Sequence, residues 1–169
     1  MKILIVGNGG RESALAWKLK DDPRVTEMYF AGGNASTQEW GKNIVESGVE
    51  ELRNFALKKQ IDLTIVGPEA PLVAGLVDEF KNYDLKVFGP RKRAAELEGS
   101  KAFSKKFMQD NTIKTAKAKI FESYNDAIDY VSEQSFPLVI KASGLAGGKG
   151  VIICQNLTDA KATIHALMI

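Results

Sequence analysis

The stretch from Lys141 to Gly150, KASGLAGGKG, combines four glycines with two lysines within ten residues. Glycines let backbone N–H groups approach an anion closely, and lysines add positive charge, so this composition suits the binding of phosphates. It is not a Walker A loop, because that loop needs GxxxxGK followed by Ser or Thr between a strand and a helix. Here Gly144 lies one residue too close to Gly148, and a glycine replaces the hydroxyl residue. The pattern predicts either a flap between two strands that closes over phosphates or a solvent-exposed hairpin.

A second glycine cluster, residues 7–10, follows the apolar run ILIV and opens a helical pattern. A tight turn at a helix N-terminus offers backbone N–H groups and partial positive charge to a phosphate or carboxylate. A dinucleotide site would need a glycine where Glu12 stands and an acid after the second strand, where the chain has residues 31–33, AGG. Both conditions fail, so the segment favours another phosphate ligand or a structural turn over a dinucleotide.

A third candidate, residues 67–71, GPEAP, follows the apolar run LTIV. Open α/β sheets bind ligands at the carboxyl ends of their strands, and there Glu69 would accept hydrogen bonds from ribose hydroxyls or an amine. A turn followed by a helix with Pro71 at its first position explains the segment equally well. The lone histidine, His165, has no partner at metal-ligand spacing, and no triad of a hydrolase stands out.

Alternating strands and helices must position these loops. The first half of the chain is expected to hold strands at 3–6, 25–31, 43–45, 63–66 and 85–88. Helices are expected at 10–20, at 49–59 and around a stripe of Leu72, Val73, Leu76, Val77 and Phe80. Short, continuously apolar strands separated by amphipathic helices predict an α/β fold, a Rossmann-like open parallel sheet with helices on both faces.

The pattern changes between residues 91 and 100, so we place a domain boundary near 99, giving domains 1–99 and 100–169. Ser100 is expected to cap a helix over 101–109, and Ser123 a helix that follows it. Other elements are expected as a helix over 91–98, strands at 118–121, 138–141 and 151–154, and a last helix from about 158.

Composition restricts the class of protein. Of the 169 residues, 44% are hydrophobic and 26% are charged, as in soluble globular proteins. No run approaches the ~18 apolar residues that span a bilayer, and the N-terminus lacks a signal-peptide cleavage pattern. The single cysteine, Cys154, lies in an apolar run, which predicts a buried thiol. A chain without an intrachain disulfide fits a cytoplasmic protein.

Charge argues against a nucleic-acid partner, because the net charge is only +2. Residues 91–119 do carry nine Lys or Arg against three acids. This run is either a solvated helical face or a surface that attracts a polyphosphate. Aromatic residues do not alternate with the basic ones as stacking platforms would.

Six segments in order resemble the glycinamide ribonucleotide synthetase (phosphoribosylamine–glycine ligase) family of ATP-grasp enzymes. They are GNGGRE (7–12), GNA (33–35), VGPEAPLVAG (66–75), FGP (88–90), LEGSKAFSK (97–105) and KASGLAGGKGV (141–151). The resemblance implies a pre-ATP-grasp domain followed by the start of an ATP-grasp domain. It also implies an ATP-dependent ligase of purine biosynthesis that joins glycine to 5-phosphoribosylamine through a glycyl phosphate.

The resemblance also implies site residues by position. Lys101 and Lys141 would hold the ATP phosphates beneath a lid that includes Gly144, Leu145, Gly147, Gly148, Lys149 and Gly150. The phosphoribosylamine pocket would include Gly9, Gly10, Arg11, Glu12, Asn34 and Glu69, with Glu69 as the first candidate for contact with the sugar or amine. The implied cofactors are ATP and Mg²⁺. Family members are longer, so the ligands for Mg²⁺ and glycine are expected beyond residue 169. The chain is therefore interpreted as a truncated N-terminal portion, inactive alone, with a monomer favoured.

Three positions depart from the family pattern. Ser13 stands where the family usually has His, Ser143 where it usually has Asp, and Gly32 where it usually has Pro. Two other functions stay open, a phosphoribosyl- or nucleotide-binding module without turnover and another ATP-grasp carboxylate–amine ligase.

Overall fold

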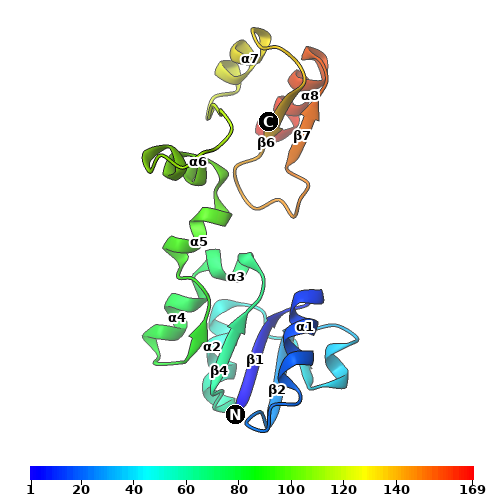
Figure 1. Cartoon of the computed structure of the whole chain (residues 1–169), viewed down its shortest axis with the longest axis vertical. Coiled ribbons are helices and arrows are strands. Elements are labelled where there is room, and N and C mark those ends of the chain that lie inside the picture. Colours follow the sequence, from blue (N-terminus) through cyan, green and yellow to red (C-terminus); the bar gives the residue numbers. More distant parts are fainter. The chain divides into compact units, whose positions relative to one another are not determined.

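The computed structural model describes residues 1–169, which form two compact units, Met1–Glu96 and Leu97–Ile169 (Figure 1). The first unit is built on a five-stranded sheet in the order β3-β2-β1-β4-β5, and every neighbouring pair is parallel. The strands are β1 (Lys2–Gly7), β2 (Glu27–Gly32), β3 (Lys42–Ile44), β4 (Leu63–Val66) and β5 (Val87–Phe88).

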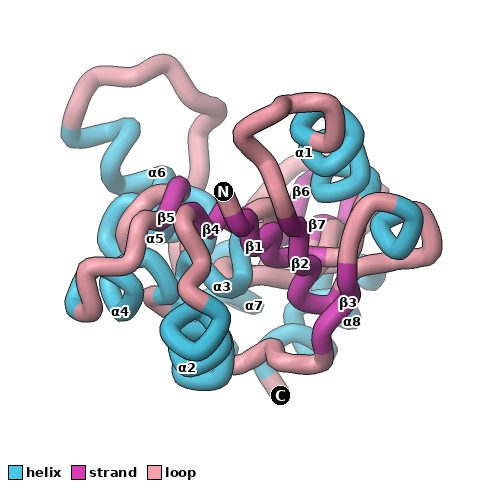
Figure 2. Tube along the Cα trace, turned by 90° about the horizontal axis from the view of Figure 1, so that it is seen from below, coloured by secondary structure: helices cyan, strands magenta, loops and turns pink.

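Helices cover both faces of this sheet, because successive side chains of a strand point to opposite faces. Ile3 and Ile5 of β1 pack in one core cluster with α1 (Gly10–Leu19). Leu4 and Val6 belong to the other cluster, formed with α2 (Val49–Lys59), α3 (Glu69–Ala74) and α4 (Leu76–Asn82). Figure 2 shows α1 and α2 on opposite sides of the strands. The predicted α/β class is confirmed.

The helix predicted around the Leu72–Phe80 stripe is two helices, which is a correction. Gly75 adopts a φ of 96° and donates its N–H to the carbonyl of Leu72, which ends α3 before α4 begins. A left-handed residue turns the backbone out of the helical path. The stripe nevertheless stays buried across the break, since Leu72, Leu76 and Phe80 all lie in the core.

The second unit pairs β6 (Leu138–Lys141) with β7 (Val151–Cys154) in an antiparallel, two-stranded sheet. One face packs on α7 (Tyr124–Ser132) and α8 (Leu157–Met168), and Cys154 is fully buried there, as predicted. α5 (Lys92–Gly99) precedes α6 (Lys101–Asp110), and the Ser100 side chain accepts the Phe103 N–H as the expected N-cap. The Ser123 hydroxyl caps α7 in the same way.

The strand predicted at 118–121 is wrong, because these residues belong to no strand or helix. An extended segment becomes a strand only when a neighbour shares its hydrogen bonds. In this chain β6 pairs with β7 alone. The preceding segment is held instead by Lys105, whose Nζ donates to Thr115 Oγ1 at 2.6 Å and to the Ala116 carbonyl at 2.8 Å. None of the helices is long and apolar enough to cross a membrane.

Candidate functional site

The loop after β1 carries the first predicted site. Gly7 has a φ of 126°, and a Cβ on it would lie 2.6 Å from Glu12 Cδ and 2.8 Å from Pro68 Cδ. The Gly9 N–H donates to Glu12 Oε2 at 2.6 Å, so the acid closes the start of α1 back on the loop. Only a residue without a side chain fits at Gly7, which explains the glycine that the sequence singled out.

Two consecutive residues of α1 connect the β1 loop to the loop after β4. The guanidinium of Arg11 donates to the Gly67 carbonyl. The neighbouring Glu12 is only 4% exposed, and its Oε1 lies 1.8 Å from the position that a Cβ on Gly67 would take. The two predicted glycine segments therefore meet at one edge of the sheet, with Arg11 and Glu12 between them.

Asn34, which follows β2, ties a third loop to the same edge. Its Nδ2 donates to the Asn8 carbonyl at 3.0 Å and to Ser13 Oγ at 3.0 Å. Its Oδ1 accepts the Ser36 N–H at 2.9 Å. Ser13 is thus a member of this network, and its Oγ lies 2.8 Å from Ser36 Oγ.

Sequence reasoning missed Ser36 and Thr37. The Thr37 side chain is fully buried, donates to the Asn34 carbonyl at 2.9 Å and accepts the Asn34 N–H at 2.8 Å. The run Asn-Ala-Ser-Thr (34–37) held the signal, because Asn, Ser and Thr side chains commonly bond to backbone two or three residues away in turns.

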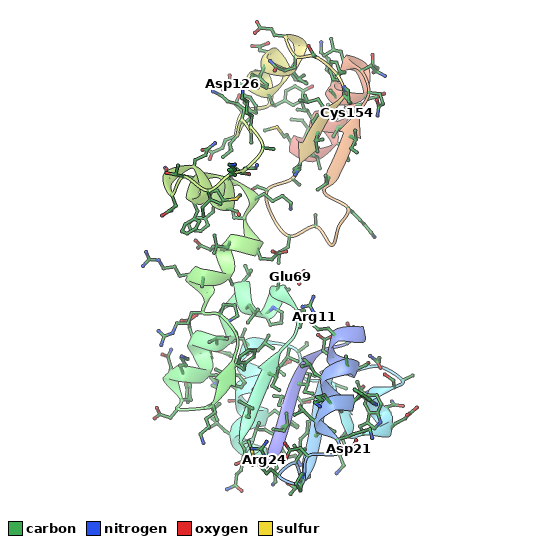
Figure 3. All side chains as sticks on the ribbon, in the orientation of Figure 1. Arg11, Asp21, Arg24, Glu69, Asp126 and Cys154 are labelled. Carbon is green, nitrogen blue, oxygen red and sulfur yellow. The ribbon has the colours of Figure 1, made fainter.

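Glu69 begins α3 directly after Pro68, which is the N-cap of that helix. Its side chain is half-buried and enters none of the hydrogen bonds or ion pairs of the chain. Figure 3 shows Arg11 and Glu69 at the edge of the first unit opposite Asp21 and Arg24. All six predicted pocket residues follow the carboxyl ends of β1, β2 and β4, which is where open sheets bind ligands.

In the second unit, the glycine-rich segment joins β6 to β7, as expected for a flap between strands. The Ala142 N–H donates to the Gly150 carbonyl at 2.8 Å at the base of the loop. At its tip, Lys149 N–H donates to the Ala146 carbonyl at 2.9 Å across Gly147 and Gly148, whose φ angles are 53° and 79°. Two successive left-handed residues make a tight turn that strongly favours glycine.

α6 brings Lys101 to this loop from 43 positions earlier in the chain, where its Nζ donates to the Gly144 carbonyl at 3.0 Å. The backbone N–H of Lys101 donates to the Ser143 carbonyl at 2.8 Å, and the N–H of Ala102 donates to Ser143 Oγ at 3.1 Å. Lys141 and Lys149 are exposed, and no ion pair of the chain includes them. Lysines beside free backbone N–H groups suit a polyphosphate.

Potential metal ligands do not cluster in this chain. No group of three or more His, Cys, Asp or Glu side chains is placed to hold an ion. At nucleotide sites Mg²⁺ is usually held by one or two carboxylates together with substrate phosphates and waters.

Comparison with known proteins identifies the family to which the chain belongs. The N domain of phosphoribosylglycinamide synthetase matches residues 1–98, and the ATP-grasp (A) domain of the same enzyme matches residues 99–169. The chain belongs to the phosphoribosylglycinamide synthetase family. The resemblance carried by the six sequence segments is thereby confirmed.

Relatives in this phosphoribosylglycinamide synthetase family are longer than the chain. A phosphoribosylamine–glycine ligase of Clostridium acetobutylicum is 50% identical over the whole chain, which covers 41% of that protein. The crystal structure of the Thermotoga maritima phosphoribosylamine–glycine ligase matches 98% of the chain with a TM-score of 0.73 and 34% identity, and 38% of its own length is covered. The chain thus spans about 40% of the length of the curated relatives it matches.

A more distant likeness concerns the fold alone. The biotin carboxylase domain of Hydrogenobacter thermophilus 2-oxoglutarate carboxylase, solved with MgADP, ADP and bicarbonate, matches 98% of the chain with a TM-score of 0.75 at 18% identity, and 40% of that chain is covered.

Proposed function

We propose that the full-length protein carrying this sequence is a phosphoribosylamine–glycine ligase. It joins glycine to 5-phosphoribosylamine and splits ATP to ADP and phosphate. The observation that carries the proposal is the convergence of Lys101 on the Gly144 carbonyl of the β6–β7 loop. A cation from one element held against a glycine-rich loop from another is suited to the phosphates of a nucleotide. The 50% identity to a ligase with this name supports the same substrates.

In this proposal, Lys101 and Lys141 bind the ATP phosphates as fixed cations. The loop members Gly144, Leu145, Gly147, Gly148, Lys149 and Gly150 cover these phosphates with backbone N–H groups and one further ammonium. The φ values of Gly147 and Gly148 support the role, because the turn they form directs backbone rather than side chains toward a ligand.

The second substrate, phosphoribosylamine, binds at the carboxyl edge of the first unit's sheet. Gly9, Gly10, Arg11, Asn34 and Glu69 line the pocket, and the buried Glu12 packs between the loops that carry them. Glu69 supplies the acceptor for a sugar hydroxyl or the amine, and this role is supported by a side chain that has no partner elsewhere in the chain. Arg11, from the first turn of α1, supplies positive charge beside it.

The proposed reaction needs alignment more than acid–base chemistry. The glycine carboxylate attacks the γ-phosphorus of ATP and releases ADP, which forms glycyl phosphate. The amine of phosphoribosylamine then attacks the acyl carbon and displaces phosphate, giving glycinamide ribonucleotide. Positioned cations offset charge on the transferred phosphoryl group, and orientation supplies much of the rate.

The test is an assay of ADP release by the full-length protein, with glycine and phosphoribosylamine supplied together or singly. We expect release only with both substrates, and formation of glycinamide ribonucleotide in equal amount. ATP hydrolysis at the same rate without either substrate would refute the ligase. Binding of ATP without any turnover would favour a binding module, and turnover with a different carboxylate would favour another ATP-grasp ligase.

A further inference from the structure

The crevice between the ends of β1 and β4 is the point where the order of the parallel sheet reverses. α1 leads from β1 to β2 on one side, whereas β4 lies on the other side of β1. Open α/β sheets bind their ligands in such a crevice, often with an anion at the helix N-terminus. In this chain the crevice already holds a carboxylate, that of Glu12.

The side chain of Glu12 packs closely against the glycines of the loops after β1 and β4. Oε2 accepts the Gly9 N–H at 2.6 Å, which is the bond that a ligand phosphate would otherwise take at the start of α1. The side chain passes so close to Gly7 and Gly67 that a Cβ on either would lie within 2.6 Å and 1.8 Å of its atoms. With 4% of its surface exposed, Glu12 is almost completely enclosed by the protein.

We propose that the side chain of Glu12 fills this crevice as a built-in hydrogen-bond acceptor and acts as a positioning residue. Its carboxylate fixes the loop after β1 against the loop after β4, so that Arg11 and Glu69 are presented in a constant arrangement. Substrate phosphate therefore binds outside the crevice. The identity of the substrate, phosphoribosylamine, rests on the proposed function, whereas the occupation of the crevice does not.

A positioning role and a contact with substrate make different demands on residue 12. Positioning requires an acceptor for the Gly9 N–H, which a glutamine amide oxygen provides in the same volume. Contact with the substrate amine would require the negative charge. Glu12→Gln therefore separates the two roles, and Glu12→Ala removes both acceptor and charge. Glu50→Ala, at an exposed acid in the first turn of α2, is the matched control.

The first measurement is steady-state kinetics of the full-length protein. We expect Glu12→Gln to keep the KM for phosphoribosylamine within about threefold of the original, since the hydrogen bond is retained. Glu12→Ala should raise that KM by about tenfold or more, with the KM values for ATP and glycine unchanged, since one buried acceptor is lost. A loss in Glu12→Gln as large as that in Glu12→Ala would overturn the proposal and assign Glu12 to the substrate. Equal changes in all three KM values would overturn it in favour of a general structural role.

The second measurement needs no turnover. Inorganic phosphate is added to each full-length variant, and the unfolding midpoint is followed. We expect phosphate to raise the unfolding midpoint of Glu12→Ala by more than it raises that of the original protein or Glu12→Gln, because only Glu12→Ala has space for an additional anion in the crevice. An equal rise in all three proteins would show that removing the Glu12 side chain creates no additional anion site, and it would refute the proposal. If Glu12→Ala does not fold, the KM of Glu12→Gln for phosphoribosylamine decides between the positioning role and contact with the substrate.

If the original protein forms no glycinamide ribonucleotide, the proposed ligase function is refuted. The comparison of unfolding midpoints in phosphate then still tests whether Glu12 fills the crevice.

Discussion

The two glycine-rich regions of this chain are held in their conformations by different interactions. In the first unit, side chains fill the space around the glycines, with Glu12 beside Gly7 and Gly67 and with Asn34 bonded to the Asn8 carbonyl. In the second unit, the β6–β7 loop is closed at its base and tip by backbone hydrogen bonds. The first region is held by side-chain packing, whereas the tip of the second is held by two successive left-handed glycines, Gly147 and Gly148.

The difference shows at which position packing requires a glycine. A Cβ on Gly67 would overlap Glu12, whereas a Cβ on Gly144 would meet no atom within 4 Å. Close packing makes a site rigid before its ligand arrives, and it makes the site intolerant of added volume. An open loop keeps room for a ligand and leaves its cations, such as Lys141, unpaired until that ligand binds.

The largest effect is expected from Lys141→Ala in the full-length protein. Removing a fixed cation from the proposed ATP site should lower kcat/KM for ATP by about 10²–10³-fold, the size seen when one preorganised donor is lost. The measurement is ADP release at varied ATP with saturating glycine and phosphoribosylamine. The folded state should be unaffected, because Lys141 is exposed and forms no ion pair.

Lys161→Ala is the matched control, since Lys161 is an exposed lysine of α8 in the same unit. We expect its kinetics to equal those of the original protein. If the kinetics of Lys141→Ala are unchanged as well, Lys141 is an ordinary surface residue. The open loop would then have no demonstrated role in binding ATP.

A smaller effect is expected from the same substitution made once in each region. Gly67→Ala should destabilise the first unit by about 1–3 kcal/mol, because the new methyl group must displace Glu12 or the β4 loop. Gly144→Ala should change stability by less than about 0.5 kcal/mol, because the site is open and its φ is not left-handed. Urea unfolding of both variants measures the two values.

The variants Gly67→Ala and Gly144→Ala also show how packing affects substrate binding. Gly67→Ala should weaken phosphoribosylamine binding more than ATP binding, because the displaced carboxylate belongs to the first region. Equal stability of the two variants would contradict the claim that side-chain packing distinguishes the regions.

Local chemistry explains how much of this structure the sequence predicted. The strands at 63–66 and 138–141 and the Ser100 cap were confirmed, because apolar runs and caps depend on residues close in sequence. The strand at 118–121 was wrong, because a strand depends on a partner that local patterns do not reveal.

The candidate site shows the same division. Motif order identified which residues lie near the carboxyl edge, but not the direction of each side chain. Glu12 was predicted as a pocket residue from its place in GNGGRE, and nothing in that pattern signals a carboxylate enclosed by Gly7 and Gly67. That contact joins residues 55 positions apart, so it depends on how β1 and β4 pair.

The smallest effect concerns Ser143, which joins the glycine loop to α6 by accepting the Ala102 N–H at 3.1 Å. Ser143→Ala removes this acceptor from a helix N-terminus and should cost about 0.5–1.5 kcal/mol. Ser143→Asp keeps an acceptor and adds negative charge at the positive end of the helix, so it should stabilise the second unit by about 0.3–1 kcal/mol at low salt. Urea unfolding at low and high salt measures both variants, with Ser135→Asp at an exposed position as control. A gain that persists at high salt would mean that charge near the α6 N-terminus is not the cause. Ser143 lies directly before Gly144. A more stable second unit with an unchanged KM for ATP would therefore show that the loop is anchored at α6 independently of the lysines that we propose bind phosphate.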